Sequence, residues 1–178
     1  YNEEEVLPET SKRLAAKLTE LESQGRISPD SRVLFVDDGS KDRTWQLISQ
    51  LHRQDARFGG VKLSRNRGHQ NALLAGLMTA KNFCDAAISM DADLQDDINA
   101  MDRMLDAFED GCDVVYGVRS SRATDTFFKR ATAQGFYKFM KRMGVDIVYN
   151  HADYRLMSRR ALEGLEKFDE VNLFLRGL

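Results

Sequence analysis

The stretch AAISMDADLQDD runs from apolar residues into four aspartates: Asp91, Asp93, Asp96 and Asp97. Carboxylates this close repel one another, so the pattern favours either screening by water or a bound cation. The pair Asp91 and Asp93, with Gln95 nearby, suits Mg²⁺ or Mn²⁺ if phosphate oxygens of a substrate complete the ligand shell. An EF-hand is excluded, because a loop that starts at Asp91 has Asp96 where glycine is needed.

Aspartate is also common at helix starts, where its side chain accepts hydrogen bonds from unpaired backbone N–H groups. Asp96 or Asp97 is predicted to cap the helix expected in INAMDRMLDAFEDG, which Gly111 ends. Such a cap leaves Asp91 and Asp93 unexplained. These two residues are therefore the candidates for chemistry.

The elements that must position these side chains alternate between strand and helix. Strands are predicted at VLFV, GVKLS, AAISM and CDVVYGVRS, with helical patterns between them. This alternation indicates crossover connections and a largely parallel α/β sheet, whose ligands bind outside the carboxyl ends of the strands. Those ends read DDGS, SRNRG, DADLQ and GVRSSR. Two acidic and two basic ends suit a substrate that has a metal-bound diphosphate and a polar base or ribose.

Composition limits the possible functions. A chain of 178 residues with 42% hydrophobic residues predicts a single domain over residues 1–178. The formal net charge of −2 argues against nucleic acid binding by bulk electrostatics. Cys84 and Cys112 lack metal or redox spacing, which favours a reducing compartment. The chain shows no signal-peptide pattern and no apolar run of about 18 residues, so we expect that by itself it does not span a membrane.

Six blocks carry a family resemblance: YNEEE, VDDGSKDRT, LSRNRGHQNALLAGL, MDADLQ, YGVRSSR and ADYRLMSRRAL. In order and spacing they resemble the inverting family 2 glycosyltransferases with a GT-A fold. They are most similar to the polyprenyl-phosphate branch, which includes dolichol-phosphate mannose synthases and bactoprenol glucosyltransferases. The resemblance implies a Rossmann-like, mostly parallel sheet flanked by helices. It also implies an enzyme that uses Mg²⁺ or Mn²⁺ to move a hexose from a nucleotide-diphosphate sugar to polyprenyl or dolichyl phosphate.

The ends of the chain differ from the family pattern. The family's first strand should precede Tyr1, so we expect that strand to be missing here, and FLRGL stands where members continue into membrane-associated helices. We therefore expect a catalytic-domain fragment that is itself soluble. The full-length protein is expected at the cytoplasmic face of a membrane, and it can form a homo-oligomer.

The resemblance also implies roles for individual residues. The metal-binding residues are Asp91, Asp93 and Gln95, and the nucleotide-binding residues are Tyr1, Asn2, Glu3, Asp37, Asp38, Arg65 and Asp91. Carboxylates suit this task because they accept paired hydrogen bonds from a base or ribose. The simpler alternatives are a helix start with acidic first-turn residues at the N-terminus and a solvated turn at the aspartate pair, where Ser40 acts only as a cap.

The implied catalytic residues are Arg119, Arg122 and Asp153. Guanidinium groups hold phosphate through paired hydrogen bonds, although a solvated basic loop is the simpler alternative for both arginines. A phosphate acceptor is largely dianionic at neutral pH and hardly needs a base. Asp153 is therefore expected to position the acceptor or metal and to assist proton removal; its alternative is a helix cap or an ion pair with Arg155. His69 receives no role.

Two other classes stay open at this stage: a receiver-type phosphoacceptor domain and a haloacid-dehalogenase-like phosphatase. The donor's base and sugar and the acceptor's identity also stay open. The segment TFFKRATAQGFYKFMKRMG, residues 126–144, interleaves aromatic and cationic side chains. Such a helix can lie at a lipid interface, or it can simply cover the sheet.

Overall fold

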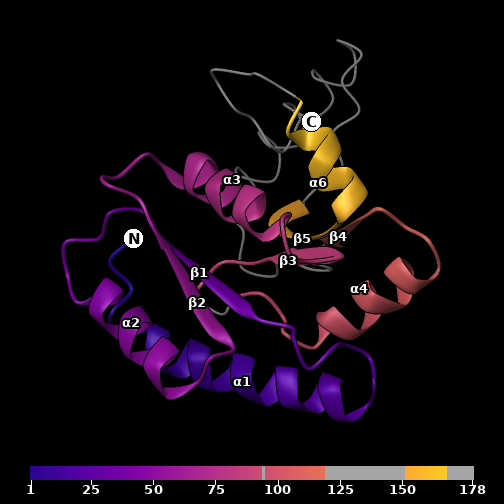
Figure 1. Cartoon of the computed structure of the whole chain (residues 1–178), viewed down its shortest axis with the longest axis horizontal. Helices are drawn as coiled ribbons and strands as arrows, with labels where there is room; N and C mark the ends of the chain where they lie inside the picture. Colours follow the sequence, from indigo (N-terminus) through magenta and orange to yellow (C-terminus); the bar gives the residue numbers. More distant parts are fainter. Residues whose placement is uncertain (94, 119–150, 168–178) are drawn as a thin grey trace, which may run out of the picture.

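The computed structural model describes residues 1–93, 95–118 and 151–167. Its elements, in chain order, are α1 (Leu7–Ser23), β1 (Val33–Asp37), α2 (Thr44–Gln54), β2 (Phe58–Lys62), α3 (His69–Ala80), β3 (Ala86–Ser89), α4 (Ala100–Glu109), β4 (Val114–Val118), β5 (His151–Ser158) and α6 (Arg159–Leu165). Helices α3 and α6 lie on one side of the strands, and α1, α2 and α4 lie on the other (Figure 1). This arrangement confirms the predicted α/β class.

The described strands form two sheets. β1 and β2 pair in parallel, from Val33 opposite Phe58 to Asp37 opposite Lys62. In the second sheet, β5 lies between β3 and β4 and runs antiparallel to both. Strands β3 and β4 therefore point the same way, as the crossover pattern predicted. The sequence analysis assigned no strand to β5, which adds antiparallel pairing to a sheet expected to be mostly parallel.

The predicted helix cap at Asp96 or Asp97 is corrected by the structure. Helix α4 begins at Ala100, and its N-cap residue Asn99 makes no side-chain cap bond. Asp97 Oδ1 instead accepts a hydrogen bond from Asn99 N at 3.0 Å, closing a turn ahead of the helix. The predicted end is confirmed, because Gly111 follows the helix with a φ of 95°, a conformation that glycine adopts readily.

Strand β5 separates two apolar clusters. Tyr154 and Leu156 pack with residues of α1, α2 and α4, whereas Met157 packs with residues of α3 and α6. Side chains alternate along a strand, so Asp153 and Arg155 share the face of Met157. Both polar side chains thus lie on the side of the sheet that α3 covers. Within the described residues, no helix combines the length and apolar character needed to cross a membrane.

Candidate active site

Asp153 on β5 is held by partners from two other segments of the fold. Its Oδ2 accepts a hydrogen bond from His69 Nε2 at 2.8 Å, and its Oδ1 accepts one from Arg155 Nη2 at 3.1 Å. On β3, the Ser89 hydroxyl donates to the main-chain oxygen of Asp153 at 2.7 Å. Asp153 and Arg155 are both buried, so the ion pair that the sequence analysis gave as an alternative is present. The aspartate also meets His69, which the alternative did not include.

Asp91 follows β3 on the same side of the molecule and is partly buried. Burial raises the pKa of its carboxyl group, and the nearby charges of Asp93, Asp96 and Asp153 raise this pKa further, while His69 lowers it. Ser89 at the end of β3 pairs with Arg155, so Asp91, two residues further along the chain, lies at the same end of the sheet as Asp153. Because burial and like charges disfavour its ionised form, a cation at this point would relieve the cost. The acidic residues therefore fit a metal-binding role.

Asp93 and Gln95 lie on the exposed part of this loop. Asp93 Oδ1 accepts a hydrogen bond from Gln95 N at 3.1 Å, and Thr10 on α1 donates to the main-chain oxygen of Ala92 at 2.6 Å. Helix α1 thus anchors the loop from behind. In the described part of the chain, no three His, Cys, Asp or Glu residues are grouped closely enough to hold a metal. A cation here would need ligands from its substrate, as the sequence analysis expected.

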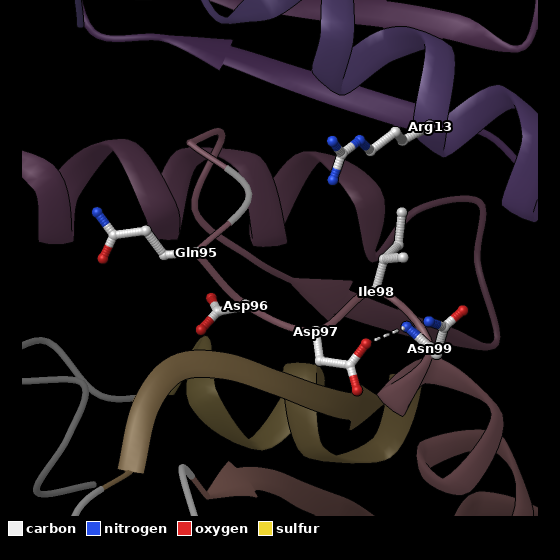
Figure 2. A pocket seen from close by; sticks show the side chains of 6 residues that line it. All are labelled: Arg13, Gln95, Asp96, Asp97, Ile98 and Asn99. Carbon is white, nitrogen blue, oxygen red and sulfur yellow. Dashed lines mark hydrogen bonds between the residues drawn. The ribbon is translucent and has the colours of Figure 1, made fainter. Parts of the chain in front are cut away.

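A pocket of about 310 Å³ lies beside the same loop. Its lining comes from α1 and from the turn before α4, as Figure 2 shows: Arg13, Gln95, Asp96, Asp97, Ile98 and Asn99. Arg13 also pairs with Glu9 one helical turn away, at 2.8 Å. The pocket thus combines the positively charged guanidinium of Arg13 with several polar groups, and it includes Gln95, one of the candidate metal residues.

The two aspartates that end β1 have different surroundings. Both carboxylate oxygens of Asp38 accept hydrogen bonds from the backbone of the next loop: Oδ1 from Arg67 N at 2.6 Å and Oδ2 from Gly68 N at 2.9 Å. Asp37 Oδ1 accepts from Ser40 N at 2.9 Å, but its buried Oδ2 has no hydrogen-bond partner among the described residues. Asp38 therefore joins the loop after β1 to the loop before α3, while one buried oxygen of Asp37 remains available as an acceptor.

The N-terminal residues bind the loop after β1. Asn2 N donates to Ser40 Oγ at 2.9 Å, and Glu3 N donates to Thr44 Oγ1 at 2.8 Å. Ser40 therefore holds the N-terminal segment, which goes beyond the capping role expected for it. Tyr1 is exposed, and α1 begins only at Leu7. The N-terminal segment is thus tied to the loop that follows Asp37 and Asp38.

Arg65 has an exposed side chain, and its backbone passes close to Gly39. A Cβ at Gly39 would lie 2.6 Å from the Arg65 carbonyl carbon, and the φ of Gly39 is 69°, so glycine is required there for two reasons. The predicted catalytic residues Arg119 and Arg122, and the segment 126–144, lie outside the described residues.

His69 is the site residue that sequence reasoning missed. It is the first residue of α3 and follows Gly68, whose φ is 86°. The sequence did contain one signal for it, because a histidine stands between a glycine and the start of an apolar helix. Its partner Asp153 is 84 residues further along the chain, so no local pattern could reveal the pair.

The fold and the site define an α/β domain with an acidic centre at strand ends, built for a ligand that carries charged or polar groups. A family profile described as Glycosyl transferase family 2 matches residues 1–165. The chain therefore belongs to glycosyltransferase family 2. This membership replaces the receiver-type and haloacid-dehalogenase-like alternatives.

Several relatives are similar over the whole of this chain. An uncharacterized glycosyltransferase, YkoT of Bacillus subtilis (strain 168), is 54% identical, and the alignment covers 53% of its length. A bactoprenol glucosyl transferase of Shigella phage SfV is 37% identical over 56% of its length. A prophage bactoprenol glucosyl transferase homolog of Escherichia coli (strain K12) is also 37% identical, again over 56% of its length. The chain thus spans about half the length of the curated relatives it matches.

Proposed function

We propose that this protein is a metal-dependent, inverting glycosyltransferase that moves a hexose from a nucleotide-diphosphate sugar to a polyprenyl phosphate. The observation that carries the proposal is the hydrogen bond between His69 and Asp153 at the end of the sheet where Asp91 follows β3, two residues after Ser89 pairs with Arg155. Three separate segments of the chain supply these side chains. Convergence of polar side chains from separate segments is typical of a binding site, whereas solvated charges are usually spread over the surface. The names of the SfV and Escherichia coli relatives support bactoprenol chemistry for the acceptor.

The donor's diphosphate is assigned to the Asp91 and Asp93 side of the centre, with Gln95 as a further polar contact. A Mg²⁺ or Mn²⁺ ion bound there would supply positive charge to the leaving nucleoside diphosphate. The nucleotide is assigned to the region of Asp37 and the N-terminal residues. Asp37 supports this role because its buried Oδ2 can accept one more hydrogen bond.

The acceptor is assigned to the side of Asp153. A polyprenyl phosphate is already largely ionised at neutral pH, so Asp153 would orient it rather than remove a tightly held proton. Direct attack by the acceptor oxygen, without an enzyme nucleophile, inverts the anomeric centre. An α-linked donor would therefore give a β-linked lipid phosphate sugar.

Two measurements test this function. Thermal unfolding with UDP, GDP, dTDP or CDP, each with and without Mn²⁺, should reveal one preferred nucleotide whose stabilisation needs the metal. Asp93→Ala should abolish that metal-dependent rise in Tm, whereas Asp110→Ala, on an exposed aspartate at the end of α4, should retain it. In the second measurement, the full-length protein is given the preferred nucleotide-hexose and a polyprenyl phosphate, and NMR should show a β-linked product. An α-linked product or undiminished metal-dependent binding in Asp93→Ala would contradict the proposal.

A further inference from the structure

The carboxylate of Asp153 is buried, and the exposed side chain that bonds to it belongs to His69. Asp153 is only 5% exposed, whereas the imidazole of His69 is 54% exposed. The two groups are joined by the 2.8 Å hydrogen bond between His69 Nε2 and Asp153 Oδ2. A molecule that approaches from the open side therefore meets the imidazole together with the edge of the carboxylate.

Both members of the pair are fixed by contacts outside it. Asp38 accepts hydrogen bonds from the backbone of Arg67 and Gly68, which sets where α3 begins and therefore where His69 lies. Asp153 is fixed from the other side by Arg155, through its Oδ1, and by Ser89, through its main-chain oxygen. The carboxyl end of β1 is thereby connected to β5 through the start of α3. An accidental surface contact would not have such support on both sides.

We infer that His69 is a positioning residue for glycosyl transfer, which holds the Asp153 carboxylate in the orientation that receives the acceptor. This inference rests on the proposed function. The carboxylate of Asp153 is held at both oxygens, by Arg155 at Oδ1 and by His69 at Oδ2, and the bond from His69 restricts rotation of the carboxylate plane. Hydrogen-bonding partners that orient a functional side chain commonly change activity by about 10- to 100-fold when they are removed.

The test compares three variants of the full-length protein in the transfer assay. His69→Ala removes the donor to Asp153, and His69→Gln keeps a neutral N–H donor. His52→Ala is the matched control, because His52 Nδ1 donates to the main-chain oxygen of Phe58 at 2.6 Å, away from the acidic centre. His69→Ala should lower kcat/KM for the polyprenyl phosphate by about 10- to 100-fold. The Kd for the nucleoside diphosphate with Mn²⁺ should change by less than about twofold, and His69→Gln should recover part of the loss.

The possible failures are distinguishable. If the wild-type protein transfers no hexose, the proposed function fails and the inference fails with it. If the wild type is active and His69→Ala keeps its kcat/KM for the acceptor, only the inference fails. A merely structural role is indicated, and the inference overturned, if His69→Ala lowers the Tm and weakens donor and acceptor alike, or if His52→Ala reproduces its acceptor defect.

Discussion

At the scale of single residues, the neighbouring Asp37 and Asp38 illustrate how one motif can contain two different roles. Both carboxylates are buried, but the two oxygens of Asp38 accept hydrogen bonds from the backbone N–H groups of residues 67 and 68. Asp37 keeps one oxygen without a partner in the described part of the chain. We therefore expect Asp38 to act on the proposed nucleotide pocket through the loop that it holds, and Asp37 to contact the nucleotide directly.

Replacing Asp38 should mainly cost stability. Asp38→Ala leaves two backbone N–H groups without their charged acceptor, so the free energy of unfolding should fall by about 2 kcal/mol. Urea denaturation measures this change. Asp30→Ala, which alters an exposed aspartate, should stay within about 0.5 kcal/mol of the wild type. If Asp38→Ala instead lost nucleotide binding at unchanged stability, Asp38 would be a direct ligand and not a link between the two loops.

At the scale of the elements, α1 supports the acidic loop and is itself fastened to α4. Lys17 of α1 is 5% exposed, and its Nζ lies 2.6 Å from Asp102 Oδ2 in α4 and 3.1 Å from Glu20 Oε2. The hydrogen bond from Lys17 is the main cause that lowers the pKa of Asp102. Burial lowers the pKa of Lys17, but the hydrogen bonds that its Nζ donates to Asp102 and Glu20 leave this pKa raised overall. The pair therefore prefers its ionised form in the folded protein.

This ion pair should give the stability a specific pH dependence. The folded-state pKa of Asp102 is depressed, so its contribution is present above its unfolded pKa of about 3.9 and is lost as the pH falls through the lower folded value. Asp102→Asn should reduce the free energy of unfolding by about 2 kcal/mol at pH 7. The difference between variant and wild type should shrink below about pH 4. Denaturation at pH 7, 5 and 3 tests this, and a difference that stays constant over that range would contradict it.

At the scale of the whole molecule, the proposed lipid acceptor requires the domain to work at a membrane surface. The segment 126–144 carries Lys138 and Lys141 among aromatic residues, and we propose that it rests on anionic membrane surfaces. The full-length protein should co-sediment with anionic vesicles at low salt and less at high salt. Lys138→Glu with Lys141→Glu should weaken this binding at least about tenfold, because each cation near the surface contributes about 1 kcal/mol.

The matched control for membrane binding is Lys12→Glu with Lys41→Glu, which alters two exposed lysines in the described part of the chain. Each double variant exchanges two positive for two negative charges and so shifts the formal net charge equally. If both double variants lose vesicle binding to the same extent, the attraction is a property of net charge. Equal binding by the wild type and the Lys138 and Lys141 variant would remove the proposed role of the segment.

The sequence by itself determined the features that depend on neighbours along the chain. Apolar runs and helical spacing located β1, α2, α3, β3, α4 and β4, because each pattern arises within a few residues. β2 begins at Phe58, ahead of the predicted GVKLS, since strand ends depend on the register with a partner strand. The ordered motifs also indicated family 2, which the match over residues 1–165 confirms.

Only the tertiary structure decided which of these side chains meet. It placed β5 antiparallel between β3 and β4, and so put Asp153 and Arg155 on the face that α3 covers. It turned Asp38 toward the loop before α3 and brought His69 to Asp153 across 84 residues. The physical reason is that these contacts depend on strand order, register and the packing of α3, which no local periodicity encodes.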